Sequence, residues 1–157
     1  MSVDIDNVTL HLRKMSEDDL DIVYANEVAA YPQHWTMGVL KDCLTSSYLC
    51  LVCELEDIII GHCFMSIAVG EAHILNICIH PDHQGKGLGR IFLRRMFRIA
   101  RDSQADTMFL EVRVSNLPAI KLYESEGFCE LGTRRNYYPA NSGKREDALM
   151  YAKPLVV

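Results

Sequence analysis

The sequence lacks any apolar stretch long enough to cross a membrane, although apolar residues make up 49% of its 157 residues. A membrane-spanning helix needs about 20 apolar residues in a row, whereas the run Ile58–Ile60 is followed at once by Gly61 and His62. The first residues, Met1–Asp4, contain neither the basic nor the apolar part of a secretory signal. We therefore expect a cytoplasmic protein that has no membrane partner.

The sequence also lacks an excess of basic residues, internal repeats and segments of low complexity. Its 16 basic and 21 acidic residues give a formal net charge of −5, which argues against non-specific nucleic-acid binding and suits a positively charged peptide or amine. No linker rich in Pro, Gly or Ser interrupts the chain, and its length fits one core. We expect a single domain over residues 1–157 and no nucleic-acid partner.

Six cysteines are present, but their surroundings argue against disulfides and against a metal site. Cys50 and Cys53 lie in an apolar run, where a free thiol behaves as a small hydrophobic side chain, and a reducing compartment keeps it free. Cys50-x-x-Cys53 and the pair His80 and His83 are spaced as in some zinc sites. However, Cys50 lies in a strand-like run, where residues three apart point to opposite faces, so Cys50 and Cys53 cannot share an ion. We expect no metal.

The order of strand and helix patterns indicates an α+β fold. Seven segments have the alternating or continuous apolar pattern of strands: residues 8–13, 48–55, 58–69, 72–79, 108–113, 128–138 and 148–153. Helices are predicted over residues 16–29, 35–46, 87–103 and 116–126. Ser16 can cap the first helix and Gly127 ends the last. A meander of strands followed by helix–strand–helix–strand predicts a mixed sheet with helices on both faces.

A glycine-rich loop joins a predicted strand to a predicted helix. Glycines at positions 85, 87 and 89 allow successive backbone N–H groups to turn towards one anion at a positive helix end, as a diphosphate would require. The loop lacks the Gly-Lys-Ser/Thr of a Walker loop and the Gly-x-Gly-x-x-Gly spacing of dinucleotide-binding folds. Of the helix's arginines only Arg90 is near this end, because each further residue adds about 1.5 Å.

Two groups of motifs carry a resemblance to a known family. Gln84–Gly89 matches Arg/Gln-x-x-Gly-x-Gly/Ala, the signature of the Gcn5-related N-acetyltransferases (GNAT). Leu110–Phe128, with Leu-Glu-Val-Arg, Ser-Asn and Leu-Tyr-Glu-Ser-x-Gly-Phe, resembles the bacterial ribosomal-protein alanine acetyltransferases (RimI), as do residues 134–139 and 145–148. The resemblance, strong over residues 74–152, implies a GNAT-type mixed, mostly antiparallel seven-stranded sheet. It also implies acetyl-CoA as co-substrate, without a metal.

The resemblance implies which residues bind acetyl-CoA. The strand would hold the pantetheine arm and the loop the pyrophosphate, through Ile77, Cys78, Ile79, Gly85, Lys86, Gly87, Leu88, Gly89 and Arg90. Ser115 or Asn116 can cap the helix that follows. The resemblance implies that Asn116 also hydrogen-bonds the pantetheine arm, since a capping amide keeps a second polar group.

The resemblance also implies a catalytic pair. Glu111 would take the proton of the attacking amine, directly or through one water, and Tyr123 would protonate the departing sulfur or hydrogen-bond to it. A sheet covered on both faces would leave little solvent around Glu111, and buried acids without a role are uncommon. The alternatives are an ordinary polar strand residue at Glu111 and a core aromatic at Tyr123.

The acceptor implied by the resemblance is the N-terminal alanine of the eighteenth small-subunit ribosomal protein. A peptide α-amine, with a pKa of about 7.7–8.0, is partly neutral at pH 7, whereas a lysine at about 10.4 needs more help. Residues 31–35 and 137–139 would flank the acceptor's entry, although Trp35 can also be a hydrophobic staple of a helix. Two alternatives stay open: a GNAT enzyme acting on other N-termini, lysines or small amines, and a non-catalytic acetyl-CoA sensor.

Overall fold

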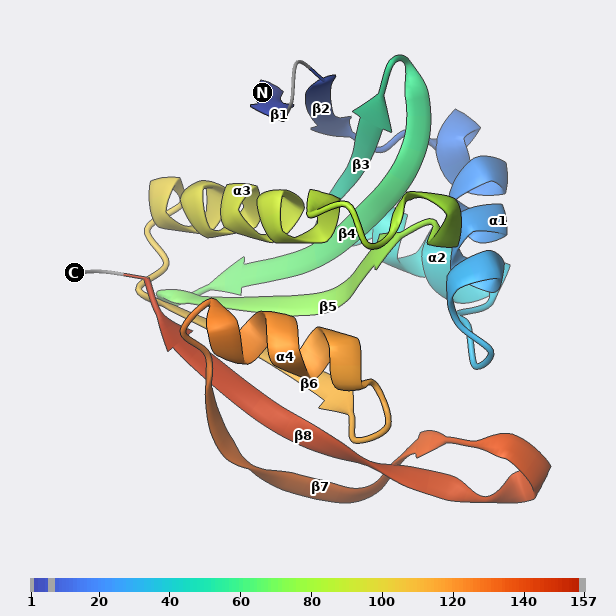
Figure 1. The fold of residues 1–157 in the computed structure, drawn as a ribbon, viewed down its shortest axis with the longest axis vertical. Helices are drawn as coiled ribbons and strands as arrows, with labels where there is room; N and C mark the ends of the chain where they lie inside the picture. Colours follow the sequence, from blue (N-terminus) through green and yellow to red (C-terminus); the bar gives the residue numbers. More distant parts are fainter. Residues whose placement is uncertain (1, 6–7, 156–157) are drawn as a thin grey trace. The chain divides into compact units, whose positions relative to one another are not determined.

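The computed structural model describes residues 2–5 and 8–155, with side chains from residue 10 onward (Figure 1). The chain forms two compact units: the first contains the residues up to Ser66 together with Leu75–Met96, and the second contains Ile67–Ile74 and the residues from Phe97 on. Strand β5 and helix α3 each pass from one unit into the other. The expectation of a single domain stays a prediction. No helix in the described part of the chain is long and apolar enough to cross a membrane.

All seven predicted strands and all four predicted helices are present, with one further short strand at the start. The strands are β1 (Ser2–Ile5), β2 (Val8–Lys14), β3 (Leu49–Leu55), β4 (Ile58–Ala68), β5 (Glu71–Ile79), β6 (Thr107–Arg113), β7 (Cys129–Pro139) and β8 (Arg145–Pro154). The α-helices are α1 (Leu20–Ala30), α2 (Met37–Thr45), α3 (Leu88–Asp102) and α4 (Leu117–Ser125). Single 3-10 turns are η1 (Glu17–Asp19), η2 (Pro81–His83) and η3 (Asn141–Gly143).

In the first unit, strands β1 to β4 form an antiparallel meander, and β5 lies next to β4 in the strand order. The backbone N–H of His80 donates to the carbonyl of Ile60 at 2.7 Å, just past the end of β5. Gly61 allows these strands their close approach, because a Cβ there would lie 2.5 Å from the carbonyl oxygen of Cys78. The end of β5 is therefore held firmly against β4.

The strands of the first unit are covered on both faces. One face packs against α1 and α2 through an apolar cluster that includes Leu20, Val23, Leu40, Cys50, Val52 and Phe64. Leu51 and Cys53 alternate with these residues along β3 and are also buried, so they point to the opposite face. Cys50 and Cys53 thus lie on opposite faces, as predicted. All six cysteines are free thiols, and only Cys129 is exposed.

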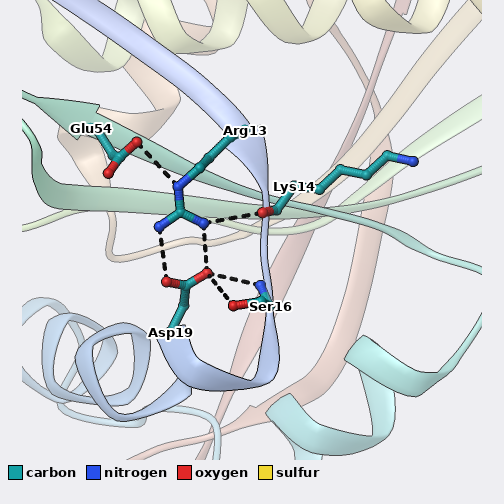
Figure 2. A network of polar contacts seen from close by, with 5 residues as sticks. All are labelled: Arg13, Lys14, Ser16, Asp19 and Glu54. Atoms are coloured by element: carbon teal, nitrogen blue, oxygen red, sulfur yellow. Dashed lines mark hydrogen bonds and ion pairs between the residues drawn. The ribbon is translucent and has the colours of Figure 1, made fainter.

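An ion-pair network connects β2 and β3 to the start of α1 (Figure 2). The guanidinium of Arg13 binds both carboxylate oxygens of Asp19, at 2.8 and 2.9 Å, and its Nε lies 3.2 Å from Oε1 of Glu54. Asp19 also accepts hydrogen bonds from the backbone N–H and the hydroxyl of Ser16. The helix predicted from Ser16 therefore begins as a 3-10 turn, and the carboxylate of its last residue, Asp19, accepts hydrogen bonds from the capping residue Ser16.

In the second unit the strand order is β5-β6-β8-β7. The first residues of β5 pair with β6 in parallel, while β6 with β8 and β7 with β8 are antiparallel. The sheet is therefore mixed and mostly antiparallel, as predicted. The ladder between β5 and β6 ends at Ile74 and Leu110, although β5 continues to Ile79 and β6 to Arg113.

Candidate active site

The glycine-rich loop lies in the first unit, between η2 and α3. Gly85 and Gly87 have φ values of +78° and +80°, which L-residues rarely adopt, and a Cβ at either would meet no heavy atom within 4 Å. The carbonyl of Gly87 accepts from the N–H of Ile91 at 3.3 Å. Helical bonding therefore starts there, so the N–H groups of Leu88, Gly89 and Arg90 precede the first intrahelical bond. N–H groups at such a helix N-terminus suit a phosphate.

The loop is fastened to the end of β5 by Gln84. Its side-chain Nε2 donates to the carbonyl of Ile79 at 2.8 Å, and its backbone N–H donates to the carbonyl of Pro81 at 3.2 Å. The Nδ1 of His80 accepts from the N–H of Asp82 at 3.1 Å. The glutamine of the signature thus shapes the loop, a role that the motif alone did not reveal.

The end of β5 has one edge directed away from β4. Because the carbonyl of Cys78 faces Gly61 on β4, and neighbouring strand residues direct their backbone groups to opposite edges, Ile77 and Ile79 face the other edge. The carbonyl of Ile77 accepts a 2.6 Å hydrogen bond from the hydroxyl of Tyr31, and that of Ile79 is bound by Gln84. Ile77 and Ile79 are therefore the residues whose backbone N–H groups can meet a ligand there.

Glu111 lies on β6 in the second unit, opposite Met150 of β8. Its Oε1 is 3.3 Å from Nε of Arg134, and its side chain is 28% exposed. The expectation that little solvent surrounds Glu111 is wrong, because residues on its face of β6 alternate with the buried ones and stay half-buried. The hydroxyl of Tyr137 also hydrogen-bonds to Glu111, and this bond raises the pKa of Tyr137.

The hairpin of β7 and β8 also places aromatic and charged groups against Arg113, two residues beyond Glu111 on β6. The guanidinium of Arg113 lies 4.5 Å from the ring centroid of Tyr138 and 3.0 Å from Oε1 of Glu146. Burial raises the pKa of Tyr138, and the charge of Glu111 adds to the rise. Burial opposes a low pKa at Glu146, but hydrogen bonds from Ser115 and Arg113 outweigh it and lower the pKa. The hairpin is therefore a preorganised polar frame.

Helix α4 carries the other two predicted site residues of the second unit. Asn116 caps it, its Oδ1 accepting from the N–H of Ala119 at 3.3 Å, and Gly127 follows its end with a φ of +93°. Tyr123 is 8% exposed, and its ring meets Phe128 edge-on with 5.7 Å between centroids. The capping role of Asn116 is confirmed. Tyr123 packs as a core aromatic, which leaves its catalytic role a proposal.

One polar cluster was missed from the sequence. Glu27, His62 and Cys78 are buried in the first unit, with potential ligand atoms within 4.8 Å of one another. Both oxygens of Glu27 already accept N–H groups, so this carboxylate is satisfied by hydrogen bonds within the first unit. The available signal was a charged residue at helical spacing from Leu20 and Val23, on the apolar side of α1.

Comparison with known proteins shows extensive similarity. The chain matches the Acetyltransferase (GNAT) family over residues 12–128. The ribosomal protein bS18-alanine N-acetyltransferase of Haemophilus influenzae is 37% identical over 134 residues, which are 85% of this chain and 91% of the relative. Its namesake in Escherichia coli is 34% identical over 144 residues, 92% and 97% of the two chains. The crystal structure of the ribosomal-protein-S18-alanine N-acetyltransferase from Escherichia coli matches with a TM-score of 0.87 at 33% identity, covering 94% of this chain and 95% of that chain.

The family match includes the glycine-rich loop as well as Glu111 and Tyr123. The chain belongs to the GNAT family and is an acetyl-CoA-dependent acetyltransferase.

Proposed function

We propose that the chain is a protein N-terminal acetyltransferase that acetylates the α-amine of the N-terminal alanine of ribosomal protein bS18, the eighteenth small-subunit protein. The observation that carries this proposal is the similarity to enzymes of that name, at 34–37% identity over most of both chains. We also propose that the enzyme is cytoplasmic and has neither nucleic acid nor a membrane as partner.

In this proposal the pyrophosphate of acetyl-CoA is bound by backbone N–H groups of the loop and of the first turn of α3. The residues concerned are Gly85, Lys86, Gly87, Leu88, Gly89 and Arg90. Lys86 and Arg90 add positive charge. Ile77 and Ile79 offer N–H groups to the pantetheine arm, and Cys78 keeps the strand in register with β4. Asn116 offers the arm its amide N–H₂, because the cap uses only Oδ1.

The proposed chemistry is direct transfer without an acyl-enzyme. The neutral amine attacks the thioester carbon, so that the C–N bond forms and the C–S bond breaks. The proton lost by the amine passes to Glu111, directly or through one water. Tyr123 protonates or hydrogen-bonds the sulfur that leaves with the electron pair. Full proton transfer from a phenol of pKa about 10 to a thiolate of about 8.5 is uphill by about 2 kcal/mol, so hydrogen bonding is its main contribution.

The same reasoning favours an α-amine over a lysine side chain. Glu111 is a partly exposed carboxylate that also binds Arg134 and Tyr137. A carboxylate suffices as base for an amine of which a minority is neutral at pH 7, but it gives less help to a lysine with a pKa near 10.4.

An acceptor panel tests the proposal. Release of free coenzyme A thiol should be rapid with a peptide that carries the bS18 N-terminus. It should be lost when the α-amine of that peptide is blocked, and low with a lysine peptide or with a polyamine. Preference for the lysine peptide or the polyamine would indicate a GNAT enzyme that acts on lysines or small amines. Tight acetyl-CoA binding without transfer to any amine would indicate a non-catalytic acetyl-CoA sensor. In cells that lack the gene, mass spectrometry should find bS18 unacetylated.

A further inference from the structure

Glu27 is a buried carboxylate that the proposed reaction does not use. It is 1% exposed and accepts three hydrogen bonds within the first unit. Nδ2 of Asn76 donates to its Oε1 at 3.0 Å, and Nε2 of His62 lies 3.2 Å from the same oxygen. The backbone N–H of Trp35 donates to Oε2 at 2.9 Å.

These three donors keep the buried charge stable. Burial raises the pKa of a carboxyl, but at Glu27 the hydrogen bonds from His62, Trp35 and Asn76 outweigh burial and lower the pKa. Nδ1 of His62 and Oδ1 of Asn76 have no hydrogen-bond partner among the described residues. Asn76 through its amide nitrogen and His62 through Nε2 both bind Glu27, which makes this carboxylate the centre of the cluster.

The cluster connects four parts of the first unit. Glu27 belongs to α1, Trp35 to the segment of residues 31–36 between α1 and α2, His62 to β4 and Asn76 to β5. We call residues 31–36 the α1–α2 loop. Of these four parts only this loop is irregular, so its shape depends most on side-chain bonds.

The loop is tied down at both ends. At its start the backbone N–H of Tyr31 donates to the carbonyl of Glu27 at 3.0 Å, and the Tyr31 hydroxyl donates to the carbonyl of Ile77 on β5. At its end Glu27 binds the N–H of Trp35, whose ring lies 5.4 Å from that of Phe64.

We propose that Glu27 is a positioning residue that holds the α1–α2 loop in the shape in which it receives the acceptor peptide. This inference rests on the proposed function, in which the loop flanks the acceptor. Glu27 is too deeply buried to touch a peptide, so it acts through Trp35. Without Glu27, the N–H of Trp35 would lose its hydrogen-bond acceptor. The loop would then have to become ordered when the peptide binds, which lowers the affinity for the peptide.

Two substitutions separate the loss of the negative charge of Glu27 from the loss of its hydrogen bond to the N–H of Trp35. Glu27→Gln should have a mild effect on KM for the peptide. The new amide NH₂ can donate to Oδ1 of Asn76 after that side chain flips, and to Nε2 of His62 in its other tautomer. Oε1 of the glutamine then still accepts from the N–H of Trp35. Glu27→Met has similar length, but it carries no charge and its thioether is only a weak acceptor. We expect it to raise KM for the peptide about tenfold or more, while the Kd of acetyl-CoA changes by less than about twofold and kcat falls less than KM rises.

Asn26→Leu is the matched control. Asn26 is also buried on α1, but its side chain donates to the carbonyl of Ile59 at 3.2 Å and thus ties α1 to β4 instead of to the loop. This variant should lose stability to a similar degree, yet leave KM for the peptide near the wild-type value. A merely structural role for Glu27 would make both variants behave alike.

Trp35 supplies a direct readout, because it is the only tryptophan of the chain. In Glu27→Met its emission should shift to the red and acrylamide should quench it more strongly, while Glu27→Gln and Asn26→Leu stay like the wild type. Unchanged emission and unchanged KM in folded Glu27→Met would overturn the proposal. If Glu27→Met does not fold, hydrogen exchange in the wild type decides: a Trp35 amide that exchanges as fast as an exposed one contradicts the tie.

Failure of the proposed function can be distinguished from failure of the proposed role of Glu27. If the wild type acetylates no peptide, the proposed function fails, whereas the emission of Trp35 still reports whether Glu27 orders the loop. If a chelator changes the emission of the wild type, then Glu27, His62 and Cys78 hold a metal ion, and the purely hydrogen-bonded tie is wrong. We expect the chelator to have no effect.

Discussion

Arg134 reaches Glu111 across an intervening strand. Arg134 lies on β7 and Glu111 on β6, and β8 runs between them. The Nε of Arg134 is 3.2 Å from the sulfur of Met150 on β8 and 3.3 Å from Oε1 of Glu111, and its guanidinium lies 5.3 Å from the ring centroid of Tyr137. The carboxylate proposed as the base is thus oriented by two side chains of the β7–β8 hairpin.

Replacing Glu111 by Gln should lower kcat by about 10²–10⁴-fold with little change in KM for acetyl-CoA, because only the removal of the amine's proton is lost. The residual rate should recover as pH rises, since the neutral fraction of the amine then grows unaided. Steady-state kinetics across pH measure this. Glu130→Gln, at an exposed position of β7, is the control and should keep wild-type kinetics. Full activity of Glu111→Gln at neutral pH would assign the base to another group.

Arg134→Met should separate the orientation of Glu111 from the stability of the fold. The ion pair is partly exposed, so its loss should cost less than about 1 kcal/mol of unfolding free energy. We expect kcat to fall by about threefold to tenfold, because the base keeps its chemistry but loses one orienting partner. Arg135→Met removes a neighbouring exposed arginine and should have no such effect. Equal kinetics in both variants would show that Glu111 needs no partner at Arg134.

Tyr123→Phe should distinguish help to the leaving group from packing. The ring stays, so stability should change by no more than about 1–1.5 kcal/mol, the size of one hydrogen bond. Acetyl transfer should fall by about 10²-fold or more with acetyl-CoA affinity unchanged, because the hydroxyl acts when charge builds on sulfur. A thioester with a more acidic thiol should rescue this variant.

The matched control for Tyr123→Phe is Tyr151→Phe. Tyr151 is buried, and its hydroxyl donates to Glu124 at 3.0 Å. This variant also loses one hydroxyl from a buried ring but should retain activity. If Tyr123→Phe turned over normally while Tyr123→Ala unfolded, Tyr123 would be a core residue only.

Gly87→Val should severely weaken acetyl-CoA binding and leave the protein folded. The space around Gly87 is open, so the effect comes from the positive φ, which costs a residue with a Cβ about 1–2 kcal/mol or else reshapes the loop. Gly143→Val is the control, because Gly143 has a φ of +72° and equally open surroundings in η3. Calorimetry should show lost affinity for Gly87→Val alone, with no dependence on magnesium. Unchanged affinity in Gly87→Val would exclude the loop as the pyrophosphate site.

The Arg13–Asp19 pair should make stability depend on pH in the acid range. The hydrogen bond from Arg13 is the main reason why the pKa of Asp19 falls from its ordinary 3.8 to about 2. The folded state therefore gains stability from this carboxylate above about pH 4, and it loses that gain as pH falls from about 4 to about 2. Because Arg13 is partly exposed, we expect Asp19→Asn to cost about 1–2 kcal/mol at pH 7. Urea unfolding of both proteins at pH 7 and pH 2.5 should show a smaller difference at the lower pH.

The sequence alone determined the features that depend on residues close together in the chain. The strands, the helices, the cap at Asn116 and the glycine-rich loop were predictable, because periodic burial, capping and positive φ are written into short stretches of chain. The family resemblance also rests on such stretches, around Gln84–Gly89 and Leu110–Phe128. Boundaries moved by a few residues where a side chain intervened, as Asp19 does at the start of α1.

Only the tertiary structure determined which polar side chains far apart in sequence meet. Glu27 binds Asn76, 49 positions later, and Arg134 binds Glu111 across β8. No local pattern encodes such pairs, because they depend on strand order, register and side-chain direction together. The exposure of Glu111 was mispredicted for the same reason. A strand pattern shows which residues alternate, but it does not show which face of the sheet is covered at that point.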